Sequence, residues 1–267
     1  NSGDRYGRTR TLKNSLANSV NTITARLMDR IGPQTVVKLA KNLGIEQRIL
    51  AVPSIALGTP DLSVYEMVAA YSTFANKGVY TQPVFLQKIE DKNGTILFEN
   101  KPVTRDVLSE ESAYVTVNLL EGVTIAGSGT RLRTTGADEY NRAYQNVVTG
   151  YPYEFTNPIA GKTGTTQNQS DGWFIGMVPN LVTGVWVGAE DRSIHFEDIA
   201  YGQGASMALP IWGLYMNSVY QDSTLMISKE SFERPKYLSI ELDCNKFVID
   251  SLGSGKTTDQ EIIDIDF

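Results

Sequence analysis

Apolar residues recur at helical spacing in the amino-terminal third of the chain. Residues 22–30 and 34–43 each place apolar side chains three or four positions apart, so each segment predicts an amphipathic helix. Gly32-Pro33 separates the two segments, and Gly44 follows the second, as glycine often does at the end of a helix. This part of the chain is therefore expected to form two helices joined by a sharp turn.

Three later segments also have helical patterns. In "DLSVYEMVAAYSTFANKG", Ser63 and Glu66 have the spacing of a capping box and Gly78 ends the segment. A helix is predicted over "EESAYVTVNLLEGV", with Ser109 as its N-cap, and a buried helix over "SMALPIWGLYMNSVY".

Alternation and turn residues indicate strands elsewhere. "PVFLQKIEDKNGTILFEN" predicts a hairpin in which Asn93 and Gly94 supply the positive φ angles of a tight turn. "IAGKTGTT", "GWFIGMVP" and "LVTGVWVGA" predict three more strands, and Pro179-Asn180 indicates that the last two are antiparallel neighbours. Residues 127–157 read as a polar loop.

The order of these elements predicts an α+β fold, in which helices flank an antiparallel sheet. Residues 1–222 carry the helical and strand patterns and are expected to form one domain. Residues 223–267 become polar and acidic and are expected to form a flexible C-terminal extension.

Composition excludes several classes of protein. A net charge of −6 and a pI near 5.0 leave no excess of basic residues for a nucleic-acid partner. No apolar run approaches the roughly 18 residues that span a bilayer, so a membrane anchor would lie outside this sequence. One cysteine, Cys244, cannot form an internal disulfide, and one histidine, His195, cannot build a histidine-rich metal site. With so few histidines, a lysine becomes the leading candidate for the base that activates a nucleophilic serine.

A lysine and two glycines inside one predicted strand need an explanation. An edge strand beside a cleft offers unpaired N–H and C=O groups to an extended peptide. Gly164 would let that peptide approach, Lys162 would place a positive charge near a carboxylate, and Thr163 or Thr165 could hydrogen-bond the same group. The alternative for Lys162 is a surface lysine that protects a sheet edge from aggregation.

A set of ordered motifs supports the cleft interpretation. "SVN" at 19–21, "SIALGTPDLSVYEMVAAYSTFANKGV", "AGKTGTT", "DGWFIGMVPNLVTGVWVG" and "ALPIWGLYMNSVY" together resemble the transpeptidase domain of class A, bifunctional penicillin-binding proteins. The resemblance extends from about Leu12 to Tyr220. It implies a fold like that of serine β-lactamases and transpeptidases.

The resemblance also implies roles for individual residues. Ser19 would relay a proton to the leaving amine, Asn21 would hold a substrate carbonyl, and the Thr165 N–H would form half of an oxyanion hole. Taken alone, "SVN" would be an ordinary helix-start signal, because serine and asparagine are common caps. Asp171, Trp173 and Phe174 also match the family's pattern, but we interpret them as packing and turn residues.

The family's first element, Ser-x-x-Lys, carries the nucleophile and its base, and no serine in this sequence has a lysine three positions later. Eighteen residues precede Ser19, whereas the family places that element several dozen residues before Ser-x-Asn. We expect an upstream segment outside this chain to supply the nucleophile. The chain alone is expected to be inactive and to lack a central core helix.

The resemblance implies a bacterial peptidoglycan D-alanyl-D-alanine transpeptidase on the outer face of the cytoplasmic membrane. Its partners would be stem peptides, and β-lactams would inhibit it. No metal or organic cofactor is implied. The alternatives are a serine β-lactamase-type hydrolase and a non-catalytic module that binds cell-wall peptides or β-lactams. A phosphate-loop reading of "DSLGSGKT" fails because Asp250 stands where glycine is required.

Overall fold

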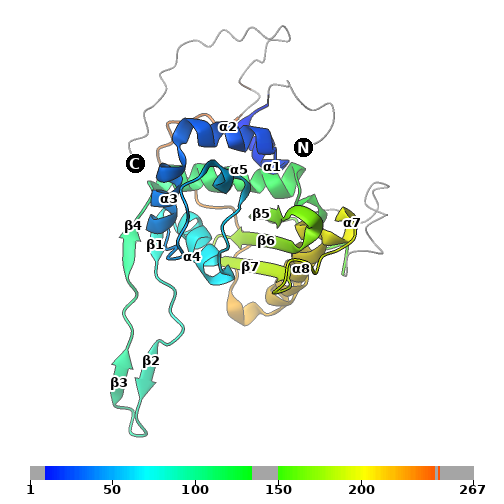
Figure 1. The fold of residues 1–267 in the computed structure, drawn as a ribbon. Coiled ribbons are helices and arrows are strands. Elements are labelled where there is room, and N and C mark those ends of the chain that lie inside the picture. Colours follow the sequence, from blue (N-terminus) through cyan, green and yellow to red (C-terminus); the bar gives the residue numbers. More distant parts are fainter. Residues whose placement is uncertain (1–9, 134–149, 244–245, 247–267) are drawn as a thin grey trace.

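The computed structural model describes residues 10–133, 150–243 and 246 (Figure 1). Cys244, residues 134–149 of the expected polar loop and the "DSLGSGKT" segment lie outside the described residues. His195 is exposed. Within the described part of the chain, no helix is long and apolar enough to cross a membrane.

The two amino-terminal helices form as the sequence predicts. They are α2 (Asn21–Ile31) and α3 (Pro33–Asn42), and a shorter helix, α1 (Leu12–Ala17), precedes them. Gly32 lies between α2 and α3 with a φ of 84°, and Pro33 occupies the first turn of α3, where its missing N–H costs nothing.

The capping-box prediction is confirmed in α4 (Val64–Ala75). The Ser63 side chain accepts the N–H of Glu66, and the Glu66 carboxylate accepts the N–H of Ser63. Gly78, which follows the helix, has a φ of 90°. A Cβ there would lie 2.2 Å from the carbonyl oxygen of Leu108, so glycine is required twice over. A short 3₁₀ helix, η1 (Pro53–Leu57), precedes α4.

The predicted hairpin projects from the body as β2 (Lys88–Glu90) paired with β3 (Ile96–Glu99) (Figure 1). A second short ladder joins β1 (Val79–Thr81) to β4 (Thr104–Asp106) at its base.

The turn at the tip of the hairpin differs from the prediction. Gly94 has a positive φ of 83°, but Asn93 does not. The Asp91 carboxylate accepts the N–H groups of Asn93 and Thr95, each at 2.8 Å, and so holds a longer loop. The prediction for Asn93 was wrong because it ignored this aspartate.

The central sheet consists of β5 (Ala160–Thr165), β6 (Asp171–Val178) and β7 (Leu181–Gly188) in the order β5-β6-β7. Both pairs are antiparallel, and Val178 pairs with Leu181 across the predicted Pro179-Asn180 turn. The three predicted strands and the neighbour relation of the last two are confirmed.

Helices cover both faces of this sheet (Figure 1). On one face lies α8 (Gly204–Gln221), whose Trp212 packs in a buried cluster with Phe174 of β6. On the other face lie α4 and α5 (Glu110–Ala126), and Val117 of α5 is buried with Met177 of β6. Alternating residues of β6 thus enter two separate cores, which confirms the α+β arrangement of helices around an antiparallel sheet.

The remaining helical segments are short. They are η2 (Thr130–Leu132), η3 (Gln167–Gln169), α7 (Ile199–Gly202) and η4 (Ser223–Leu225).

Candidate active site

Strand β5 forms one edge of the central sheet. Within the described residues β6 is the strand that pairs with it, and its other side carries no strand. Because side chains alternate along a strand, Lys162 and Gly164 lie on the face that α5 covers, and Thr163 and Thr165 lie on the α8 face. The edge position that the sequence analysis inferred for this strand is confirmed.

Ser19 lies in a Schellman motif at the end of α1. Its N–H donates to the carbonyl of Leu16 at 3.1 Å, the N–H of Val20 donates to that of Ser15 at 2.9 Å, and Ser19 itself has a φ of 50°. This left-handed position usually holds glycine. Val20, not Ser19, is the N-cap of α2, and the described structure gives α2 no side-chain cap. The Ser19 side chain therefore does not cap α2, although this helix does begin at Asn21 of the "SVN" segment.

The end of α5 holds the α1 segment close to the sheet. The Ser128 N–H donates to the carbonyl of Ala17 at 3.0 Å, and the hydroxyl groups of Ser128 and Thr163 lie 2.6 Å apart. A Cβ on Gly127 would lie 2.1 Å from the carbonyl oxygen of Ala17, so glycine permits this approach. The sequence analysis missed Ser128, because no local pattern marks a residue that joins two distant segments.

Lys162 and Ser19 meet across this junction, although 143 positions separate them in the sequence. The Lys162 ammonium donates to the Ser19 hydroxyl oxygen at 2.5 Å and to the Thr163 carbonyl at 2.9 Å. Burial lowers the pKa of Lys162 to about 8, because removing water disfavours the charged amine. Lys162 therefore loses its proton more readily than a solvated lysine would, and it is not the exposed surface lysine of the alternative interpretation.

The other predicted site residues border this pair. The Thr165 hydroxyl oxygen accepts the N–H of Gly204 at 2.9 Å, which leaves its hydrogen available to a ligand. A Cβ on Gly164 would lie 3.1 Å from the Cβ of Trp173, so the cross-strand neighbour already favours glycine there. Asn21 is an exposed residue at the start of α2, two positions after Ser19. The roles assigned to these residues stay predictions.

Asp171 and Phe174 behave as the packing and turn interpretation requires. Phe174 is fully buried, and the Asp171 side chain is 8% exposed. The Asp171 carboxylate accepts the indole N–H of Trp186 at 3.0 Å and the Ser170 hydroxyl at 3.0 Å, and it lies 3.6 Å from the Arg192 guanidinium. These contacts fasten the turn that follows β5.

Comparison with known proteins identifies the family to which this chain belongs. The family model described as penicillin binding protein transpeptidase domain matches residues 1–191. This chain belongs to that family. Two relatives of the transpeptidase domain are penicillin-binding protein 1A of Aquifex aeolicus, 36% identical over 225 residues, and penicillin-binding protein 2D of Bacillus subtilis, 33% identical over 226 residues. The resemblance to class A penicillin-binding proteins is confirmed.

Solved structures agree on the fold of this transpeptidase domain. The PonA1 protein from Mycobacterium tuberculosis in complex with penicillin V has a TM-score of 0.66 and 25% identity, and the match covers 88% of this chain and 62% of that one. Penicillin-binding protein 1A from Haemophilus influenzae has a TM-score of 0.68 at 21% identity, over 87% of this chain and 39% of that one. The predicted β-lactamase and transpeptidase type of fold is confirmed.

The transpeptidase chain spans a limited part of its relatives. The matches cover 84% of this chain and 27% of the Aquifex protein, and 85% of this chain and 30% of the Bacillus protein. The activities of the whole relatives therefore apply to this chain only as a proposal.

The left-handed backbone at Ser19 leads to a first prediction. Ser19→Gly should be more stable than Ser19→Ala by about 1 kcal/mol, because both lose the hydroxyl but only glycine relieves the positive φ. Urea unfolding of the two variants under identical conditions measures this difference. Equal stabilities would show that the position carries no backbone strain.

Proposed function

We propose that this chain is part of a peptidoglycan D-alanyl-D-alanine transpeptidase that cross-links cell-wall stem peptides. The observation that carries the proposal is the Lys162–Ser19 hydrogen bond on the strandless edge of β5, in a chain of the penicillin-binding transpeptidase family. Family membership implies serine acyltransferase chemistry in general. Stem peptides are the substrates and β-lactams the inhibitors.

Each site residue takes a part in acyl transfer. The extended donor peptide adds to the outer edge of β5, where backbone groups can pair with it. Lys162, in its charged form, attracts the terminal carboxylate, and the Thr163 and Thr165 hydroxyl groups add hydrogen bonds. Gly164 has no side chain, so the peptide backbone can approach the strand closely.

Ser19 and Asn21, at the junction of α1 and α2, and the Thr165 N–H of β5 act on the reacting groups. A serine oxygen forms a bond to the penultimate D-alanine carbonyl carbon, the C–N bond breaks, and the terminal D-alanine leaves with a proton relayed through Ser19. The N–H of Thr165 stabilises the charge on the carbonyl oxygen, and Asn21 holds a substrate backbone carbonyl. An amine of a neighbouring strand then takes the acyl group.

The nucleophile comes from an upstream segment in this proposal. No Ser-x-x-Lys occurs in the sequence, so the chain alone cannot form the acyl-enzyme. We use "parent protein" for this chain joined to that segment. The parent acts on the outer face of the cytoplasmic membrane through an anchor outside this chain. Residues 1–222 contribute to its transpeptidase domain, and 223–267 form the C-terminal extension.

The alternatives are less favoured. A β-lactamase-type hydrolase would also use Ser-x-x-Lys, Ser-x-Asn and Lys-Thr-Gly, but the matched relatives are named penicillin-binding proteins. A non-catalytic binding module would account for a missing nucleophile, but not for a part-buried lysine hydrogen-bonded to a serine in a left-handed position.

Labelling with fluorescent penicillin tests the proposal. The parent protein should become covalently labelled in proportion to its concentration, and this chain alone should stay dark, because only the parent holds the nucleophile. Prior incubation with unlabelled penicillin should abolish the signal, and rapid turnover of nitrocefin would indicate the hydrolase instead. A stable label on this chain alone would contradict the account, since it would require a nucleophile among these residues.

A further inference from the structure

The part of the C-terminal extension that the structure describes lies against the domain. Residues 226–243, which we call the C-terminal strap, follow η4 and begin at the β6–β7 turn. The Asn180 side chain donates to the Met226 carbonyl at 3.0 Å and accepts the Ser228 N–H at 2.8 Å. The strap therefore starts from a fixed point on the central sheet.

Phe232 anchors the strap in the core. This side chain is 9% exposed, in a segment that is otherwise mostly exposed. It belongs to one buried cluster with residues of three other elements: Val117 and Leu120 of α5, Ala160 of β5, and Met177 of β6. Removing the Phe232 side chain would therefore expose apolar surface of α5, β5 and β6 to water.

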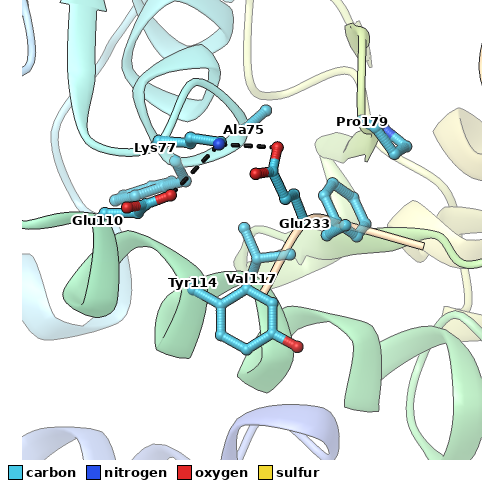
Figure 2. A pocket seen from close by; sticks show the side chains of 9 residues that line it. Ala75, Lys77, Glu110, Tyr114, Val117, Pro179 and Glu233 are labelled. Carbon is cyan, nitrogen blue, oxygen red and sulfur yellow. Dashed lines mark ion pairs between the residues drawn. The ribbon is translucent and has the colours of Figure 1, made fainter. Parts of the chain in front are cut away.

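Polar contacts hold the strap on either side of Phe232. The Lys77 ammonium lies 2.7 Å from Glu233 and 3.3 Å from Glu110, and Figure 2 shows it between the two carboxylates. The hydrogen bond with Glu233 raises the pKa of Lys77. Further along, the Glu111 carboxylate accepts the Ser239 hydroxyl at 2.7 Å. The strap thus bridges the end of α4 and the start of α5.

Packing beneath the strap is incomplete. A cavity of about 120 Å³ lies there, lined by Phe74, Tyr114 and Phe232 among others, with Lys77 and Glu233 at its side (Figure 2). The strap and the domain are therefore not packed continuously here, and Phe232 is the strap residue that enters the cluster formed by α5, β5 and β6.

Two routes connect this anchor to the catalytic strand. Ala160, in the Phe232 cluster, stands two residues before Lys162, and both side chains lie on the same face of β5. The strap also holds the first turn of α5, whose far end places Ser128 against Thr163. Loss of the Phe232 contact would therefore weaken the packing at the start of β5 and the packing between β5 and α5.

We propose that the C-terminal strap, through Phe232, is a positioning element for β5 that keeps Lys162 in register with Ser19. This inference rests on the proposed transpeptidase function. It gives the described part of the C-terminal extension a role in positioning catalytic residues.

Acylation kinetics of the parent protein test this role. Phe232→Ala should lower the second-order rate constant for penicillin acylation by on the order of tenfold, because small displacements of catalytic groups cost large factors in rate. Phe232→Leu should restore most of the rate, since it refills the apolar site. Tyr237→Ala, at a strap residue that is 76% exposed, should leave the rate unchanged.

Two further readouts separate positioning from stability. The midpoint of the acylation pH profile should move upward in Phe232→Ala, because water reaching Lys162 raises its pKa. Amide hydrogen exchange over 160–165 should accelerate in the same variant and not in Tyr237→Ala. A smaller labelled fraction with an unchanged rate constant, midpoint and exchange would overturn the proposal. If the unmodified parent is never labelled, the proposed function fails, and the exchange measurement still decides the role of the strap.

Discussion

Lys162→Ala should slow penicillin acylation of the parent protein by on the order of a hundredfold or more. The substitution removes the charge that attracts the carboxylate and the partner through which Ser19 exchanges its proton. Groups that act in acid–base or electrostatic catalysis typically contribute factors of about 10² to 10⁴. Stopped-flow fluorescence with a penicillin reporter measures the rate constant directly.

A matched control uses another lysine. Lys92 is exposed at the tip of the β2–β3 hairpin, so Lys92→Ala should leave acylation unchanged. Circular dichroism should confirm that both variants fold. An acylation rate in Lys162→Ala within twofold of the unmodified parent would remove Lys162 from the mechanism.

The stability of the parent protein should rise between about pH 8 and pH 10.5 through the titration of Lys162. Burial lowers the pKa of this lysine from 10.5 to about 8 in the folded chain. Below pH 8 the folded and unfolded states both carry the proton, and the folded state bears the full cost of burying the charge. Between the two pKa values the unfolded state binds more protons, so stability increases with pH. The total effect is at most about 3.4 kcal/mol, at 1.36 kcal/mol per pKa unit.

Comparison with Lys162→Met isolates this effect from other titrating groups. The variant keeps an unbranched side chain without the charge. It should be more stable than the unmodified protein at pH 7, and the difference should vanish above about pH 10.5. Urea unfolding at several pH values measures both curves. If the difference in unfolding free energy between the two proteins stayed constant from pH 7 to above pH 10.5, burial would not disfavour the charged form of Lys162.

These two predictions describe one compromise. The fold holds a part-buried lysine with a lowered pKa and a serine with a positive φ, and each is unfavourable for stability. In exchange, the fold brings the Lys162 ammonium and the Ser19 hydroxyl into contact, and this contact serves the proposed catalysis. Stabilising substitutions at Lys162 or Ser19 should therefore cost activity, as is common at functional sites.

Local signals in the sequence were sufficient for most elements of the fold. The capping box at Ser63, the Gly32-Pro33 break and the Pro179-Asn180 turn each depend on residues within a few positions of one another, and the structure contains all three. The hairpin tip failed at Asn93, where the side chain of Asp91 decides the loop.

Contacts between residues far apart in the sequence could not be predicted from local patterns. The family pattern suggested that Ser19 and Lys162 share a site, but the left-handed backbone of Ser19 and the Ser128–Thr163 contact come from packing between distant segments. The burial of Phe232 within a polar extension likewise depends on a site formed by α5, β5 and β6. A single phenylalanine carries no local signal for such an anchor.

Lys162 of β5 and Ser19 at the end of α1 are proposed to serve acyl transfer between D-amino-acid peptides. Mass spectrometry of a synthetic stem pentapeptide, incubated with the parent protein and an isotopically labelled D-amino acid, tests it most directly. The account predicts exchange of the terminal D-alanine for the labelled residue, loss of exchange with penicillin, and loss of exchange in Lys162→Ala. A folded, penicillin-labelled parent that exchanges equally well with and without Lys162 would contradict it.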